Sequence, residues 1–525
     1  MNPFDWSQPY PSRRSPVLAR NIVATSQPLA AQAGLRMLLA GGNAVDAALA
    51  TAIALTVVEP TSNGIGSDAF AIVFDGKKLH GLNASGRSPA AWTPGRFAGL
   101  SSMPARGWDT VTVPGAVSAW VTLSQAFGAL PFEKLFAPAI AYARHGFPVS
   151  PVIARAWQGA AAAFKDFPDF QSSFTTAGRA PAAGETWRFE DQARTLERIA
   201  ATRGEAFYRG EIAQSIAAHA AATGGLLTAD DLAEHTADRV EPIATDFRGY
   251  TVHEIPPNGQ GLAALIALGI LERSRLSDFD VDTTDFFHVQ IEAMKLAFAD
   301  AHRYISDIDT MEFAPTELLQ PAYLDARAKR IDMKHAGEPT FGVPTEGGTV
   351  YLTTADASGM MVSFIQSNYV GFGSGVVVPG TGISLQNRGK GFTLEAGHPN
   401  QVGPRKRPYH TIIPAFVTRD GEPVMSFGVM GGPMQPQGHV QMMVRIVACG
   451  QNPQAAADAP RWQVFDGRTV TLEAGVAPDV VEELTRRGHR ISHGPNGGGA
   501  QLIWKLEDGY AAASEPRKDG HAVGF

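Results

Sequence analysis

A threonine that follows two glycines is the clearest candidate for chemistry in this chain. Gly347 and Gly348 precede Thr349, and β-branched and apolar residues follow it. Glycine tolerates the strained backbone that self-cleavage requires. If the Thr349 hydroxyl attacks the preceding carbonyl, an ester forms, and water then releases a new chain that begins with threonine. The freed α-amine, with an ordinary pKa of about 8, can act as the general base for the hydroxyl beside it.

The residues around Thr349 predict a β-hairpin that brings a second polar side chain to it. Residues 349–354 and 360–366 have the composition of strands, and a turn sequence at 356–359 joins them. A three-residue loop at 357–359 places Ser367 opposite Thr349, whereas a four-residue loop places Gln366 there. With the shorter loop, the Ser367 hydroxyl can hydrogen-bond the nucleophile.

A pair of glycines later in the chain can supply donors for an oxyanion. Gly431 and Gly432 follow a predicted strand at 424–429, and a helix is expected at 441–448. Their N–H groups carry no side chain that would obstruct a developing negative charge. An isolated glycine pair is more often a simple bend, so the chemistry depends on where the fold places it.

The elements that must position these residues are helices and strands of mixed order. Helices are predicted at 29–40 and 44–58, with Asn43 as the cap of the second, and a buried strand is predicted at 69–74. The region from about 130 to 330 is mostly helical and reads as a scaffold. A stretch rich in proline, glycine and charge, 336–348, reads as an exposed segment just before Thr349.

Composition excludes several other classes of function. The chain has 44 Lys and Arg against 51 Asp and Glu, a net charge of −7, and no dense basic run, so neither nucleic acid nor a membrane surface is an expected partner. Its only cysteine, Cys449, excludes an intrachain disulfide and a cysteine-based metal site. The histidine and acidic spacings match no metal motif, so no metal or other cofactor is expected. The longest apolar stretch, 44–58, is too short to span a bilayer and the N-terminus has no signal-peptide layout, so a cytoplasmic location is expected.

The ordered motifs at 41–48 and 59–66, the Thr349 strand and the glycine pair at 431–432 together resemble the γ-glutamyltranspeptidase family of N-terminal-nucleophile hydrolases. The resemblance implies an α/β (α+β) fold, a four-layer αββα sandwich with a largely helical lobe at about 130–330. It also implies self-cleavage between Gly348 and Thr349 into a large (α) subunit, 1–348, and a small (β) subunit, 349–525, which stay together. Pairing of two such heterodimers is left open.

The same resemblance assigns roles to individual residues. Thr349 matches the family nucleophile, and Ser367 stands where the family usually has the second threonine of its catalytic pair. Gly431 and Gly432 match the oxyanion-hole glycines. The machinery for amide cleavage is therefore expected to be complete.

The positions that bind the γ-glutamyl group in the family differ in this chain. The arginine that holds the α-carboxylate is missing or displaced by two residues, to Arg87. The paired serines align with His410 and Thr411. The aspartate that binds the α-ammonium aligns with Gly391.

Two further helper positions, an asparagine and a glutamine in the family, are Tyr369 and Arg388. Without a carboxylate to pair with it, a buried ammonium would be costly, so the substrate is expected to lack one. The guanidinium groups of Arg388 and Arg87 suit a carboxylate, which favours an anionic acyl donor. Each of the two has a structural alternative, an ion pair within the protein, and His410 has one as a core histidine.

The predicted substrate is thus a small amide with an anionic acyl group. The segments 85–89 and 365–369 look most like the branch of the family that contains oxamate amidohydrolase and the γ-glutamyltransferase-like proteins. An oxamate-type donor is the first expectation. The alternatives are a γ-glutamyltransferase or glutathione hydrolase, a glutaryl-type acylase and, least favoured, a non-catalytic scaffold.

Overall fold

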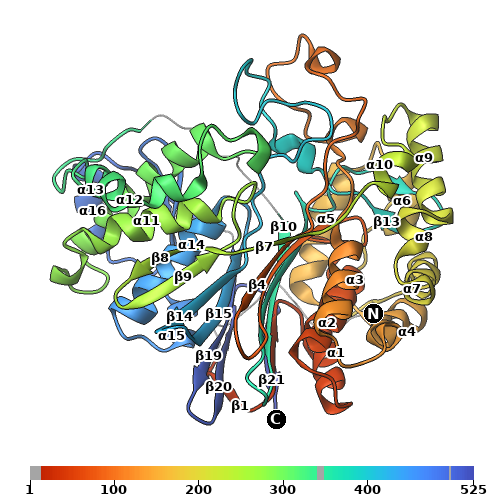
Figure 1. The fold of residues 1–525 in the computed structure, drawn as a ribbon, viewed down its shortest axis with the longest axis horizontal. Coiled ribbons are helices and arrows are strands. Elements are labelled where there is room, and N and C mark those ends of the chain that lie inside the picture. The colour runs from red at the N-terminus through yellow and green to blue at the C-terminus, as the bar shows by residue number, and fades with distance from the viewer. Residues whose placement is uncertain (1–13, 340–347, 496–497) are drawn as a thin grey trace.

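Two seven-stranded β-sheets lie face to face between two layers of helices (Figure 1). The computed structural model describes residues 14–339, 348–495 and 498–525, so Gly347 and most of the segment expected at 336–348 lie outside the described residues. All neighbouring strands within both sheets are antiparallel. Sheet I contains, in spatial order, β21 (His521–Gly524), β2 (Ile22–Thr25), β10 (Gly348–Ala355), β11 (Met361–Tyr369), β3 (Asp68–Phe74), β4 (Leu79–Asn83) and β7 (Asp238–Val240). Sheet II contains β1 (Val17–Ala19), β20 (Gly509–Ser514), β19 (Gly499–Leu506), β15 (Glu422–Met430), β14 (Ala415–Arg419), β9 (Tyr250–Glu254) and β8 (Ile243–Phe247).

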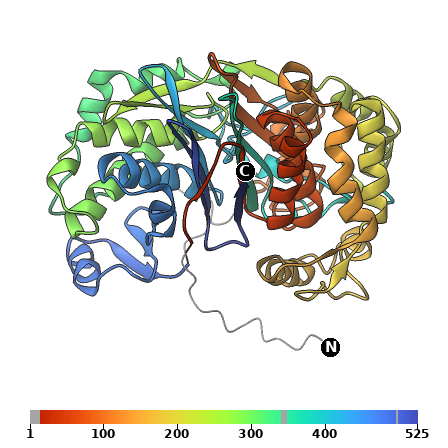
Figure 2. The ribbon, with the colours of Figure 1, turned by 90° about the horizontal axis from the view of Figure 1, so that it is seen from below.

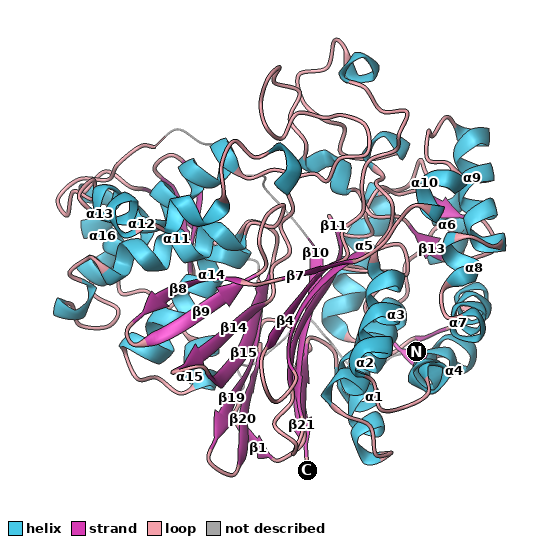
Figure 3. Ribbon diagram, viewed as in Figure 1, coloured by secondary structure: helices cyan, strands magenta, loops and turns pink. Residues whose placement is uncertain are grey.

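The helices divide between the outer faces of the two sheets, as the view from below shows (Figure 2). Those on the side of sheet I are α1 (Pro28–Leu39), α2 (Ala44–Val58), α3 (Ala116–Phe127), α4 (Ala137–His145), α5 (Pro151–Ala163), α6 (Pro168–Phe174), α7 (Glu190–Thr202), α8 (Glu205–Tyr208), α9 (Glu211–Thr223) and α10 (Ala229–Ala233). Those on the side of sheet II are α11 (Gly261–Glu272), α12 (Thr284–Tyr304), α13 (Pro321–Ala328), α14 (Met434–Met443), α15 (Pro453–Asp458) and α16 (Pro478–Arg486). Figure 3 distinguishes the helices, strands and loops of this arrangement by colour. Smaller strand pairs and a three-stranded sheet complete the fold: β5 (Phe147–Pro148) with β6 (Thr186–Trp187), β12 (Val377–Val378) with β13 (Ile383–Ser384), and β16 (Trp462–Asp466) with β17 (Thr469–Leu472) and β18 (Arg490–His493).

Three hydrophobic cores correspond to the three interfaces of this four-layer arrangement. One lies between sheet I and its helices, and a second lies between sheet II and α11, α12 and α14. The third lies between the sheets and includes Phe70, Ile365 and Tyr351 from sheet I and Phe416 and Ile503 from sheet II. The αββα fold expected from the sequence is confirmed.

Helix α2 shows how local sequence sets this packing. Its composition is apolar on every side, and all its residues are buried, as is typical of a helix between two layers of protein. Asn43 caps it, and the Asp46 carboxylate accepts a hydrogen bond from the Asn43 N–H in return. Asp46 also accepts from the N–H groups of Ala129 and Leu130, which ties the end of α3 to the start of α2.

The β10–β11 hairpin has the register that a short loop requires. Val350 pairs with Gln366, and an irregularity then follows, so that Gly348 pairs with Tyr369. This register corresponds to the three-residue loop and directs Ser367, not Gln366, to Thr349. Gly359, with φ of +93°, makes the turn.

The stretch from about 130 to 330 is mostly helical and also contributes β7, β8 and β9 to the two sheets. Its helices lie in both outer layers, with α4–α10 on sheet I and α11–α13 on sheet II (Figure 1). Among the described residues, none of the helices has both the length and the apolar character needed to cross a bilayer.

Candidate active site

Thr349 lies near the start of β10 with two polar partners at its hydroxyl. Its Oγ1 donates a hydrogen bond to Ser367 Oγ at 3.2 Å, and Gln435 Nε2 approaches the same Oγ1 at 3.4 Å. Ser367 Oγ in turn accepts a hydrogen bond from the Tyr369 N–H at 2.8 Å. The Ile413 N–H donates to Gln435 Oε1 at 3.0 Å and orients the amide. Thr349 as a whole is buried, with 2 % of the residue exposed.

Gly431 and Gly432 connect β15 of sheet II to α14, which carries Gln435. Their φ angles, +122° and +58°, are in the region that favours glycine. The Gly431 carbonyl accepts a hydrogen bond from the Met434 N–H at 3.1 Å. This carbonyl and the Gly432 N–H belong to the same trans peptide group, so the Gly432 N–H points away from the start of α14. Within the described part of the chain, neither glycine N–H donates to a backbone carbonyl. Both N–H groups thus remain available beside the helix that reaches Thr349.

Arg388 is a buried cation close to the hairpin. It opens a short 3₁₀ turn, Arg388–Gly391, and is 1 % exposed. Its Nη1 donates to Thr411 Oγ1 at 2.8 Å, and its guanidinium lies 4.6 Å from the centre of the Tyr369 ring. Tyr369 has a positive φ of +78°, uncommon for a non-glycine residue, which turns its ring under the guanidinium. Burial lowers the pKa of Arg388 to about 10, so it stays charged near neutral pH.

One edge of this guanidinium has no hydrogen-bond partner among the residues that the structure describes. Arg388 Nε and Nη2 are buried and make no hydrogen bond within the described residues. The same residues place no carboxylate oxygen within 4 Å of Arg388, although Asp68 is close enough to act on it electrostatically. The Nε/Nη2 edge is the one that grips a carboxylate with two parallel hydrogen bonds.

Asp68 is a site residue that sequence analysis did not identify. It opens β3 directly opposite Ser367 of β11, so Thr349, Ser367 and Asp68 form a row across three strands. Its carboxylate accepts hydrogen bonds from the N–H groups of Gly86 at 3.3 Å and Gly115 at 3.1 Å. Burial raises the pKa of Asp68 to about 7, and the positive charge of Arg388 limits the rise.

His410 belongs to this buried group and not to an open surface. Its Nδ1 accepts from the Ile412 N–H at 3.3 Å, so its Nε2–H points to Asp68 Oδ2, 3.2 Å away. Burial lowers the pKa of His410 well below its ordinary value, so the ring is neutral. The ring also makes an edge-on contact with Phe70 at 4.8 Å. The structure therefore places His410 as a support for Asp68.

With this geometry in view, comparison with known proteins decides the family. The family model described as Gamma-glutamyltranspeptidase matches residues 30–525. The chain belongs to the γ-glutamyltranspeptidase family. The resemblance predicted from the sequence is confirmed, and as a member of this family the chain is an amidohydrolase.

Relatives of this transpeptidase-family chain align over nearly its whole length. It is 35 % identical to the glutathione hydrolase-like YwrD proenzyme of Bacillus subtilis, with 98 % of this chain and 100 % of the relative covered. It is also 35 % identical to the oxamate amidohydrolase proenzyme of Klebsiella pneumoniae, with 95 % and 97 % covered. The crystal structure of a cephalosporin acylase from Bacillus halodurans superimposes with a TM-score of 0.95 at 50 % identity, and 100 % and 99 % of the two chains are covered.

Arg87 is not part of the group around Thr349 in this family member. Its Nη1 pairs with Asp307 at 2.7 Å and donates to the Arg405 carbonyl at 3.2 Å, and its side chain is 37 % exposed. A second carboxylate, Asp309, lies 3.6 Å from its Nη2. The expectation that Arg87 faces the substrate carboxylate has no support in these contacts, because its charge is already paired by a distant segment of the chain.

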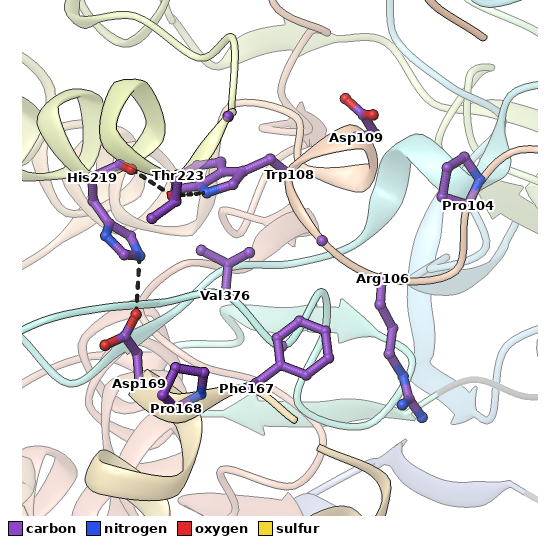
Figure 4. A pocket seen from close by; sticks show the side chains of 13 residues that line it. Pro104, Arg106, Trp108, Asp109, Phe167, Pro168, Asp169, His219, Thr223 and Val376 are labelled. Atoms are coloured by element: carbon purple, nitrogen blue, oxygen red, sulfur yellow. Dashed lines mark hydrogen bonds and ion pairs between the residues drawn. The ribbon is translucent and has the colours of Figure 1, made fainter. Parts of the chain in front are cut away.

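A separate cavity of about 410 Å³ lies between the segment 104–109, α6 and α9 of the transpeptidase-family chain (Figure 4). Trp108 and Phe167 line it, and His219 pairs with Asp169 at 3.4 Å on one wall. None of the residues that surround Thr349 lines this cavity. The chemistry of the hydroxyl is thus located elsewhere, at the meeting point of the two sheets.

Proposed function

We propose that the protein is made as a single chain that cuts itself between Gly348 and Thr349 and then hydrolyses amides whose acyl group carries a carboxylate. In the first step Thr349 Oγ attacks the Gly348 carbonyl, the peptide bond is replaced by an ester, and water hydrolyses the ester. The products are fragments 1–348 and 349–525, the second with a free α-amine on Thr349. The proenzyme names of both curated relatives support this step.

In each later cycle the Thr349 amine takes the hydroxyl proton while Oγ attacks the substrate carbonyl. The N–H groups of Gly431 and Gly432 stabilise the oxyanion. The proton passes to the leaving amine as the C–N bond breaks, and an acyl ester of Thr349 remains. Water then attacks the ester and releases the acid. Ser367 and Gln435 orient the hydroxyl, a role supported by their contacts with Oγ1.

The free Nε/Nη2 edge of Arg388 is the observation that supports an anionic donor. A buried guanidinium with unmade hydrogen bonds is costly, and a substrate carboxylate would make two of them at once. Thr411 and Tyr369 hold the guanidinium in place for this contact.

A γ-glutamyl donor, with its α-ammonium, is less well supported. A side chain at Gly391, where the family has its ammonium-binding aspartate, would place a Cβ 2.4 Å from the Tyr409 carbonyl oxygen. No carboxylate can therefore take that position without a change in the backbone. The substrate class we favour is a monoamide of a dicarboxylic acid.

Two candidate donors of different acyl length belong to this class. The activity named for the Klebsiella relative supports oxamate, the shortest such donor. The 50 % identity to the cephalosporin acylase of Bacillus halodurans favours, as a second candidate, a larger amide such as a glutaryl-type donor.

Two measurements test the proposal. The wild type and Thr349→Ala are compared on a denaturing gel with N-terminal sequencing; we expect two fragments, the smaller beginning Thr-Val-Tyr-Leu, only in the wild type. Hydrolysis by the matured wild type is then measured with oxamate, glutaryl-p-nitroanilide, butyryl-p-nitroanilide and γ-glutamyl-p-nitroanilide. A preference for the neutral butyryl or the zwitterionic γ-glutamyl donor would refute the anionic assignment, and an uncut wild type would refute the mechanism.

A further inference from the structure

A buried polar cluster joins the two parts of the chain that lie on either side of the Gly348–Thr349 junction. His288, Glu292 and Lys295 project from α12, and His489 comes from the turn between α16 and β18. All four are buried, and Lys295 is completely inaccessible to solvent. None of them contacts the residues around Thr349 in the described part of the chain, so the catalytic mechanism above does not use this cluster.

The hydrogen bonds of the cluster determine which ring nitrogens of His288 and His489 carry a proton. His288 Nε2 lies 2.9 Å from the Asp332 carbonyl oxygen, which can only accept, so His288 Nδ1 carries the lone pair. His489 Nε2, 2.8 Å from that Nδ1, must then be the donor, and His489 Nδ1 receives Lys295 Nζ at 3.5 Å. Burial lowers the pKa of both imidazoles, that of His489 to about 2, in agreement with two neutral rings.

Glu292 and Lys295 together grip one peptide group on each side of Gly337. Glu292 Oε2 accepts the Gly337 N–H at 3.0 Å, and Lys295 Nζ donates to the Gly337 carbonyl at 3.0 Å. Glu292 Oε1 and Lys295 Nζ pair with each other at 2.7 Å. A Cβ on Gly337 would lie 2.8 Å from Glu292 Oε2, so a side chain there would displace the Glu292 carboxylate from its present position.

Neighbouring contacts tie the same segment to residues beyond Thr349. The Ala336 N–H donates to the Arg487 carbonyl at 2.7 Å, and Glu338 lies 3.4 Å from Arg468. With His489, three residues of the 349–525 part therefore hold a segment of the 1–348 part. Gly337 precedes Thr349 by only twelve positions in the sequence.

The cluster is complete without a metal ion. His288, Glu292 and His489 offer ligand atoms that lie within 4.8 Å of one another, a spacing that would suit a cation. The Lys295 ammonium already supplies the positive charge, and its three contacts use the available acceptors of Glu292, Gly337 and His489. A divalent ion at this place would meet that ammonium at close range.

We infer that the Glu292–Lys295 clamp on Gly337 is a positioning device for self-cleavage. This inference rests on the proposed function. Gly348 and Thr349 both lie in β10, so the sheet holds the two residues of the scissile bond, and the clamp holds the chain eleven residues upstream of Gly348. An additional anchor upstream narrows the range of orientations of the Gly348 peptide group and raises the share in which its carbonyl meets Thr349 Oγ. Because the clamp acts through the chain and not on the substrate, it governs maturation and not turnover.

The test follows maturation of the full-length chain made by cell-free translation with a pulse of labelled methionine. Gly337→Ala and Glu292→Gln are compared with the wild type, and the appearance of the 349–525 fragment is timed on a gel. We expect both variants to mature at least about 10-fold more slowly. Once cut, their kcat per mole of free Thr349 α-amine is expected to equal that of the wild type.

Two controls separate positioning from general stability. Arg445→Met removes another ion pair between the two parts of the chain, Arg445–Asp282 at 2.6 Å, and is expected to mature at the wild-type rate. The double variant Glu292→Met with Lys295→Met removes the clamp without leaving a buried unpaired charge, and it is expected to mature as slowly as the single variants. Melting temperatures of all variants are measured in parallel.

The results discriminate clearly. Wild-type maturation rates in Gly337→Ala and Glu292→Gln would overturn the inference. Equal slowing by Arg445→Met would also overturn the inference, because the cause would then be the stability of the contact between the two fragments. A wild-type maturation rate in the double methionine variant would overturn it as well, because the slowing in Glu292→Gln would then come from an unpaired buried charge. If the wild type itself is not cut, the proposed function fails first, and that result is seen before any variant is compared.

Discussion

Replacing Arg388 with methionine tests the assignment of the acyl-binding residue directly. Methionine is similar in length and apolar, so it fills much of the same space without the charge. The Thr411 hydroxyl loses its 2.8 Å donor, and the Tyr369 ring loses the cation above it. The hydroxyl of Thr349 is expected to keep its contacts with Ser367 and Gln435, since Arg388 takes part in neither of them.

The size of the effect follows from the two free donors. A carboxylate on the Nε/Nη2 edge receives two hydrogen bonds from a charged group, each of which contributes about 1.5–3 kcal/mol. Allowing for the desolvation of the carboxylate, we take the net loss as about 3–4 kcal/mol. This corresponds to a decrease in kcat/KM of about 200- to 1,000-fold for a carboxylate donor. A neutral donor makes no such contact, and its kcat/KM should change less than about 5-fold.

The assay compares glutaryl-p-nitroanilide with butyryl-p-nitroanilide in matured wild type, Arg388→Met and Arg388→Lys. Lysine restores the charge but not the two-pronged geometry, so it should recover only part of the lost rate. The ratio between the two donors is the decisive quantity, since any general damage to the site lowers both rates together. Equal losses for the two donors would show that Arg388 is structural, and our account of the substrate would then be wrong.

Three other predictions concern neighbouring residues. Burial raises the pKa of Asp68 from 3.8 to about 7, so its contribution to stability is complete below about pH 4 and is lost as the pH rises through 7. In an uncut Thr349→Ala background, the free energy of unfolding of Asp68→Asn, measured with urea, should therefore gain up to about 4 kcal/mol relative to that of Asp68 between pH 4 and 8. A difference that does not depend on pH would contradict the raised pKa. Ser367→Ala should lower kcat about 2- to 10-fold through loss of the 3.2 Å contact, while Ser367→Thr should retain most of it in steady-state assays; full activity in the alanine variant would remove Ser367 from the mechanism. Asp46→Ala should lower the free energy of unfolding by about 2–3 kcal/mol, because three N–H groups lose their acceptor, and a loss below 0.5 kcal/mol in the same urea assay would show that water replaces it.

Local signals in the sequence were sufficient for the catalytic hairpin. The predicted strands at 349–354 and 360–366 correspond to β10 and β11. Of the two possible turn loops, the three-residue loop at 357–359 gives the observed contact between Thr349 and Ser367. The helix expected at 44–58 has the observed bounds, with Asn43 as its cap. These features depend on turn chemistry, capping and spacing within a few residues, which a sequence displays directly.

Residues that join the site only through long-range pairing of strands and loops could not be predicted from such local signals. Asp68 belongs to the site because β3 pairs with β11 in one particular register, and a single acidic residue before an apolar strand gives no sign of that register. Gln435 lies in the first turn of α14, a helix whose start was predicted at 441; Pro436 and Gly438 weaken the helical pattern there. For Arg87 the sequence left an ion pair within the protein open as an alternative, but it could not identify the partner, because Asp307 is 220 residues away.

In the proposed site, the division between the two sheets and the segments that connect their strands would allow donor choice to change while the catalytic group stays in place. Sheet I supplies Thr349 and Ser367, while the end of β15 in sheet II supplies the glycine pair, so the packing of one sheet on the other sets the catalytic distances. The groups that we propose as contacts of the acyl donor, Arg388 and Thr411, lie outside both sheets, on segments that connect strands. A change in those segments moves charge in the acyl pocket and leaves the interface between the sheets intact. Most of the departures from the family pattern fall on connecting segments, whereas Tyr369 and Ser367 lie in β11 of sheet I. This distribution agrees with selection that acted mainly on the donor, while the proposed nucleophile and oxyanion donors stayed fixed by the core.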